Sequence, residues 1–216
     1  VSPATAVVDG IHELQQMGEL ARTNLKMSME ALCEPDEKKI KAVCEQEAYI
    51  DFLNREITDY LVKISELDLP IADAKILGGL FHVVNDIERI GDHAENFAEA
   101  AKERMEKQIP FSEKAIRQIR EMAEMVTEVL DYALQMFSER STEHMKEVLQ
   151  LEEAVDQLER KLQKAHVKRL TKGKCTPEAS MLYSDAISGL ERAADHATNI
   201  AFAILEPEDL SEEEEE

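Results

Sequence analysis

The chain has 216 residues, of which 44% are hydrophobic, and its 46 acidic against 25 basic residues give a formal net charge of −21. Helix-forming residues dominate, while glycine, proline and aromatic residues are few, so a β-rich fold and general disorder are both excluded. The excess of negative charge disfavours binding to nucleic acid and to anionic membrane surfaces and favours binding of cations.

The first half of the chain is predicted to form three long helices. The first covers residues 4–33, and Pro35 is placed for the first turn of the second, which runs to about residue 67. The third covers about residues 70–108. The longest apolar runs have only six residues, so we expect no helix that spans a membrane.

The second half is predicted to form three more helices. Ser112 is a candidate N-cap for the fourth helix, and residues 140–142 separate it from the fifth. Thr176 is a candidate N-cap for the sixth helix, with Pro177 in its first turn. Apolar residues recur every three or four positions, which is typical of helices that pack in a bundle; they include Ile116, Ile119, Met122, Val126, Val129, Ala133 and Met136, and then Val148, Leu151, Val155, Leu158 and Leu162.

The two halves repeat each other. The stretch "ERIGDHAENFA" matches "ERAADHATNIA" at seven of eleven positions when the chain is shifted by 103 residues, and earlier helices match at a shift of 105. We therefore predict an all-α protein of two tandem three-helix bundles, with one repeat at residues 1–108 and the other at 109–205. Residues 206–216 hold eight acidic residues and are predicted to be a disordered acidic tail.

Cysteine usage gives little functional signal. Cys33, Cys44 and Cys175 are odd in number, lack close CxxC spacing and have no counterparts in the repeat. This disfavours a disulfide framework and indicates a reducing compartment. We interpret the three residues as filling the core.

Each half carries two Glu-x-x-x-Asp pairs. Residues four apart lie on one helical face, so each pair places two carboxylates close together, and either a metal ion or an arginine could relieve their repulsion. Acidic pairs at this spacing are common on solvated faces. Glu47, however, interrupts the apolar stripe of its helix, where a carboxylate is costly to bury unless it is paired or bound to metal. The candidate metal ligands are Glu47, Asp51, Glu88 and Asp92 in the first half and Glu152, Asp156, Glu191 and Asp195 in the second.

A histidine follows the aspartate of one pair in each half. His93 and His196 could orient or bind a metal, but histidines that pack between helices are commoner. Both interpretations stay open. Gly91 and the alanines of the two motifs are interpreted as allowing close approach of helices.

The motifs "DIERIGDHAENFAE" and "GLERAADHATNIA" resemble those of the PhoU family, and the similarity spans about residues 11–205. This resemblance implies a regulator of phosphate uptake and of the phosphate-starvation response that is not an enzyme. It also implies that the eight acidic residues hold multinuclear metal clusters, with iron as the expected metal and zinc, manganese or magnesium as alternatives.

A finer resemblance points to the PhoU-type domain at the C-terminus of bacterial sodium–phosphate cotransporters. It rests on "EQEAYIDFLNREITDYLVKIS", on "HVVNDIERIGDHAENFAE" and on a start at valine. It implies a cytoplasmic domain at the inner face of the membrane, whose partner is a transporter domain or a phosphate-signalling protein. Three alternative functions stay open: a stand-alone PhoU-type negative regulator, a carboxylate-bridged metalloenzyme, and a helical adaptor without metal. Association as a homodimer also stays open.

Overall fold

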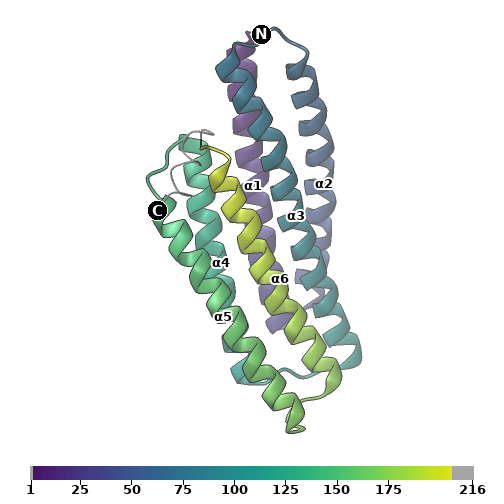
Figure 1. Cartoon of the computed structure of the whole chain (residues 1–216). Helices are drawn as coiled ribbons and strands as arrows, with labels where there is room; N and C mark the ends of the chain where they lie inside the picture. The colour runs from purple at the N-terminus through teal and green to yellow at the C-terminus, as the bar shows by residue number, and fades with distance from the viewer. Residues whose placement is uncertain (1, 206–216) are drawn as a thin grey trace.

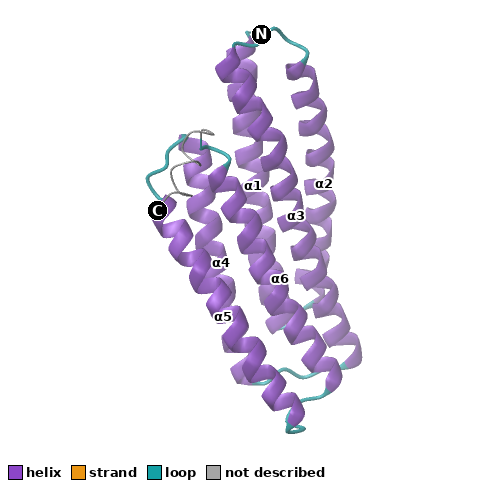
Figure 2. Cartoon of the chain, in the orientation of Figure 1, coloured by secondary structure: helices purple, strands orange, loops and turns teal. Residues whose placement is uncertain are grey.

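The computed structural model describes residues 2–205, and the regular secondary structure of this range is entirely α-helical (Figure 2). The all-α prediction is therefore confirmed, whereas the predicted acidic tail at 206–216 lies outside the described residues. None of the helices described is long and apolar enough to cross a membrane. The helices are α1 (Pro3–Cys33), α2 (Glu37–Ser65), α3 (Ile71–Lys107), α4 (Glu113–Glu139), α5 (Met145–Thr171) and α6 (Pro177–Phe202).

Side-chain caps define where several helices begin. Ser112 accepts a hydrogen bond from the amide of Ala115, and Thr176 accepts one from Ala179, so both predicted N-caps are confirmed. The prediction for Pro35 is wrong: the N-cap of α2 is Asp36, and the proline lies before the helix. The Asp36 carboxylate accepts from the first free amides of α2, so the helix begins at Glu37, two residues after Pro35.

Helices α1 to α3 form one bundle and α4 to α6 form a second one beside it (Figure 1). The bundles meet where α1 packs on α4 and α3 packs on α6. Within the described residues, α2 contacts only α1 and α3, while α5 contacts only α4 and α6. Each repeat thus has one outer helix, and α3 and α6 lie centrally between the outer helices.

The core consists of the apolar stripes that the sequence predicts. Of the seven apolar positions predicted for the α4 stripe, Ile116 is half-buried and the other six are buried. In α5, Leu151 and Leu158 are half-buried and the remaining three are buried. Burial of this apolar surface supplies the main stabilisation of the bundles.

The cysteines are all free, in agreement with the sequence analysis. Cys33 is buried, but Cys44 is exposed and Cys175 is half-buried. The core interpretation is therefore wrong for the last two, because Cys44 lies on the solvent face of α2 and Cys175 lies in the connection between α5 and α6.

Two glycines allow a matched test of the backbone. Gly173 has φ of +67°, whereas Gly78 lies within α3, and an added methyl group would meet nothing within 4 Å at either position. Gly173→Ala should lower the free energy of unfolding by about 1 kcal/mol, because an L residue is strained at positive φ. Gly78→Ala should raise it by roughly 0.5–1 kcal/mol, because alanine favours the helix. Urea denaturation of both variants checks this, and a loss of stability in Gly78→Ala would contradict the α3 geometry.

Candidate metal centres

The facing sides of α2 and α3 carry the first acidic cluster, which we define as Glu47, Asp51, Glu88 and Asp92. Glu47, Asp51 and Asp92 each have a carboxylate oxygen within 4.8 Å of the other two. Glu88 lies beside them: its pKa is raised to about 7, chiefly by burial and then by the neighbouring Asp92. The structure therefore brings together three of the four predicted ligands and places the fourth at the edge of the group.

Glu47 has the most unusual environment in this cluster. Its side chain is 2% exposed, and neither carboxylate oxygen has a hydrogen-bond partner. Burial, followed by the charges of Asp51 and Asp92, raises its pKa to about 8. A buried carboxylate without partners is strongly unfavourable unless it is protonated or faces a cation.

Gly91 on α3 makes room for the Glu47 carboxylate. A Cβ atom at this position would lie 2.8 Å from Oε2 and 3.0 Å from Oε1 of Glu47. The close approach that the sequence interpretation assigned to Gly91 is made by the carboxyl group of Glu47 from α2. The absence of a side chain at Gly91 and the two unpartnered oxygens both fit a site that accommodates a cation.

Helices α5 and α6 carry the second acidic cluster, defined as Glu152, Asp156, Glu191 and Asp195. Glu152, Asp156 and Asp195 again bring oxygens within 4.8 Å of one another. Burial and the adjacent Asp195 raise the pKa of Glu191 to about 7. One oxygen of Asp156 is buried without a partner.

The second cluster is less enclosed than the first. Glu152 is half-buried and Asp195 is exposed, in contrast to Glu47. The repeat position of Gly91 is Ala194, and the position of Glu95, whose charge raises the pKa of Glu47, is Thr198 in the second half. The first cluster is consequently both more acidic and more deeply buried. Sequence analysis missed Glu95, although its place one helical turn after Asp92 was a usable signal.

Arginine pairing does not account for either cluster. Within residues 2–205, none of the eight carboxylates forms an ion pair with lysine or arginine. The ion pair nearest in sequence to the second cluster joins Arg160 to a carboxylate oxygen of Glu153 at 3.9 Å, and Glu153 is not a member of that cluster. This observation favours a metal ion over the arginine alternative.

The two histidines lie at the contact between α3 and α6 rather than within the clusters. Their ring centroids are 5.9 Å apart. His196 donates from Nδ1 to the buried carboxylate of Asp86 at 3.0 Å. His93 instead stacks on Phe97, and burial lowers its pKa to about 4. The histidines thus join the two repeats. Asp86 has no acidic counterpart in the second repeat, where Gly189 takes its place.

Known proteins share this fold. A family model for the PhoU domain matches residues 14–101 and 119–204. An accessory protein of the phosphate-specific transport system, a PhoU homologue from Synechocystis, is 31% identical over 88% of this chain and 83% of its own length. PhoU homolog 1 from Thermotoga maritima is 26% identical over 89% of this chain and 83% of its own length. The crystal structure of PhoU from Pseudomonas aeruginosa superimposes with a TM-score of 0.88 and 24% identity, covering 94% of this chain and 97% of that one.

The buried carboxylate predicts a pH dependence of stability in metal-free protein. The Glu47 pKa is raised from the ordinary 4.5 to about 8, so between these values the folded protein holds a proton that the unfolded chain releases. The free energy of unfolding should therefore fall as pH rises through this window, with Glu47 contributing at most about 1.4 kcal/mol per pH unit.

Glu47→Gln should reduce this slope and make the protein more stable than wild type above pH 8. Some slope should remain, because the pKa values of Glu88 and Glu191 are raised as well. Glu45→Gln, at an exposed position on the same helix, is the matched control. The measurement is urea denaturation with chelator from pH 5 to pH 9, and equal slopes for wild type and Glu47→Gln would contradict the burial of this charge.

Proposed function

The chain belongs to the PhoU family, and on that premise we propose that it is a metal-binding regulator of phosphate transport. The observation that carries the metal part is the buried Glu47 carboxylate, which faces Gly91 and has no partner. The regulatory part is supported by the relatives, which are named as accessory proteins of the phosphate-specific transport system. These names describe no enzyme, and we assign the chain no catalytic reaction.

The relatives favour the role of a PhoU accessory protein over that of a cotransporter domain, which was the first interpretation of the sequence. The matching proteins are named PhoU homologues, and they align with this chain over more than four fifths of their own length in the best-covered cases. We therefore propose the accessory-protein role as the function and keep the cotransporter domain as the second candidate. Its support is the motif resemblance in α2 and α3.

The donor atoms of both clusters restrict the choice of metal. Each cluster offers only carboxylate oxygens. Oxygen ligands suit iron, manganese and magnesium better than zinc, which in structural sites prefers cysteine and histidine. We propose iron as the metal, with the eight acidic residues of the two clusters as its ligands.

The clusters connect the outer helices to the centre of the molecule. Glu47 and Asp51 come from α2, while Glu88 and Asp92 come from α3, and α2 has no contact with the second repeat within the described residues. A cation would neutralise the repelling carboxylates and so hold the outer helix against the central one. In this proposal the acidic residues fix the surface that the transport partner recognises.

Substitution of one aspartate in each half should separate the two sites. Asp92→Asn should lower metal binding in the first cluster and spare the second, while Asp195→Asn should do the reverse, because each removes a ligand charge and keeps the side-chain shape. Asp59→Asn, an exposed residue further along α2, is the control. Elemental analysis and melting temperature, each with and without chelator, give the readout.

Chelation should lower the melting temperature of wild type, since bound metal stabilises the native state by mass action. Full metal content in Asp92→Asn together with a raised melting temperature would mean that the first cluster is only a repelling acidic face.

The regulatory proposal is tested in a bacterium whose own PhoU accessory protein has been deleted. Expression of this chain should lower uptake of labelled phosphate at high external phosphate. The Asp92→Asn/Asp195→Asn double variant, expressed at the same level, should fail to do so, and Asp59→Asn should act like wild type. Full restoration by the double variant would separate regulation from the metal clusters, whereas no effect of wild type would contradict the accessory role.

A further inference from the structure

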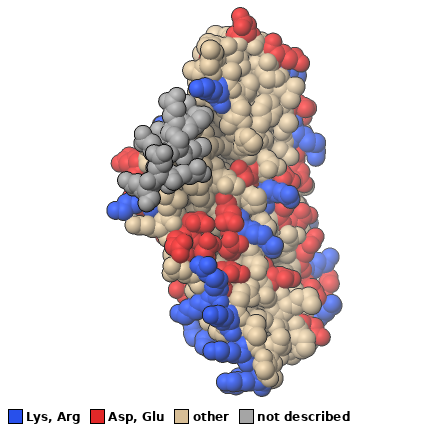
Figure 3. Space-filling model, in the orientation of Figure 1, with Lys and Arg blue, Asp and Glu red and all other residues tan. Residues whose placement is uncertain are grey.

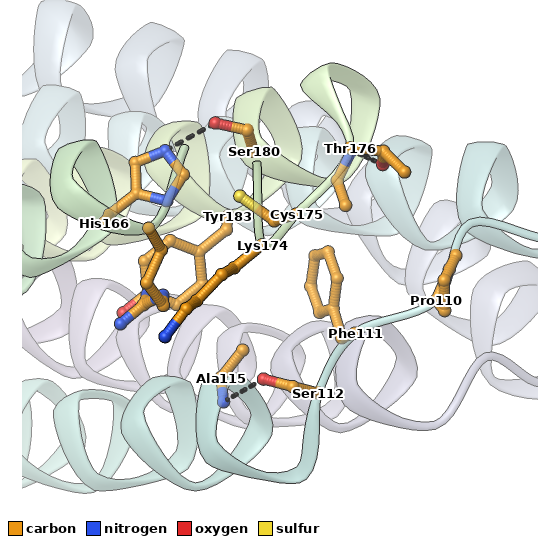
Figure 4. A pocket seen from close by; sticks show the side chains of 12 residues that line it. Pro110, Phe111, Ser112, Ala115, His166, Lys174, Cys175, Thr176, Ser180 and Tyr183 are labelled. Carbon is orange, nitrogen blue, oxygen red and sulfur yellow. Dashed lines mark hydrogen bonds between the residues drawn. The ribbon is translucent and has the colours of Figure 1, made fainter. Parts of the chain in front are cut away.

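A pocket of about 420 Å³ lies at the end of the second bundle, and none of its lining residues belongs to either acidic cluster. Figure 4 shows its lining side chains. It is formed by the connection from α3 to α4, the last turns of α5, the connection from α5 to α6 and the first turns of α6. Arg169 lines the pocket. It follows Asp156 of the second acidic cluster by 13 residues on α5, which corresponds to about 20 Å along the helix axis. The size is within the usual range for small-molecule sites.

The charge around this pocket is opposite to that of the whole chain. Residues 160–174 contain no acidic residue, and they hold seven of the 25 bases: Arg160, Lys161, Lys164, Lys168, Arg169, Lys172 and Lys174. Figure 3 shows lysine and arginine gathered over the lower part of α5. Salt screens charges beyond about 8–10 Å, so this local excess decides what the pocket attracts. The net charge of −21 masks this basic run in the sequence.

The residues that line the pocket carry the same sign. Arg169 and Lys174 contribute positive charge, and none of the lining residues is acidic, although about one residue in five of the chain is. The N-caps of two helices, Ser112 of α4 and Thr176 of α6, also line it, so the positive ends of both helix dipoles lie at its wall. By contrast, the groove beside His93 contains three acidic residues.

The remaining walls are apolar and aromatic. In Figure 4 the Phe111 ring lies across the pocket from Tyr183 and Lys174. The Tyr183 hydroxyl donates to Gln118 at 2.7 Å, and the buried His166 is 2.6 Å from the Ser180 hydroxyl oxygen, so these polar groups are held in place. Tyr183 is only 3% exposed and lies under Arg169, whereas Phe111 is half-buried and has Arg104 over its ring at 4.1 Å from the centroid. The pocket therefore combines the aromatic ring of Phe111 with two cationic side chains.

We propose that this pocket binds a small phosphorylated molecule with a flat ring system, the chemistry of a nucleoside diphosphate. Arg169 and Lys174 bind the phosphates, and the half-buried Phe111 contacts the ring. Charge-assisted contacts to phosphate and stacking on aromatic side chains are the two interactions that such a ligand offers. The site is separate from the metal clusters, so its test neither requires metal nor reports on it.

The test is calorimetric titration of the full chain, kept in chelator, with ADP, adenosine and inorganic phosphate. ADP should bind saturably with one site per chain, and adenosine and phosphate should each bind more weakly, because each offers only one of the two interactions. Arg169→Gln and Lys174→Gln should each raise the Kd for ADP about tenfold. Lys172→Gln, which removes the same charge at an exposed position outside the pocket, should change it less than about twofold.

Three results would overturn the proposal: no saturable binding of ADP up to about 1 mM, binding of phosphate as tight as that of ADP, or equal weakening by all three substitutions. The last would show diffuse attraction to the basic end of α5 instead of a built pocket.

A second measurement places the ligand. Cys175 lines the pocket and is half-buried, Cys33 is buried, and Cys44 is exposed. In Cys44→Ser protein, reaction of Cys175 with a thiol reagent should become slower as ADP saturates. Binding of ADP without protection of Cys175 would put the ligand elsewhere and overturn the assignment of this pocket.

Discussion

The arrangement of the first repeat depends on one buried charge. Glu47 projects from α2 onto the glycine backbone of α3, is almost inaccessible to solvent and has no hydrogen-bond partner. Removal of a carboxylate from water without compensation costs several kcal/mol, so this geometry requires either a bound proton or a nearby cation. Asp51 and Asp92 supply further oxygens at the same place, which favours the cation.

Duplication of the three-helix unit places a related cluster on α5 and α6, but the two clusters have diverged. The enclosure provided by Gly91 and the extra charge of Glu95 occur in the first repeat only, where the second has Ala194 and Thr198. Because α3 and α6 contact each other at the centre, a change at either cluster acts on a helix that packs against the other repeat. Each candidate metal cluster is therefore linked through one central helix to the interface between the repeats.

The sequence was sufficient for the helices and for the doubled layout, because apolar periodicity and N-caps such as Ser112 and Thr176 are local signals. It also singled out Glu47, since a charge inside an apolar stripe is visible without a structure. Three features depended on contacts between distant segments and were not predictable in the same way: the space that Gly91 leaves for Glu47, the bond from His196 to Asp86, and the pocket that Arg169 lines. The basic run in α5 was visible in the sequence but was hidden by the net charge of the whole chain.

Anomalous diffraction tests the metal account most directly. Crystals of protein purified without chelator should be measured on both sides of the iron absorption edge. The account predicts one anomalous peak, or group of peaks, between α2 and α3 within bonding distance of Glu47, Asp51 and Asp92, and another between α5 and α6 beside Glu152, Asp156 and Asp195. Crystals of protein loaded with iron that show no anomalous density at either position, with Glu47 turned out to solvent, would contradict it.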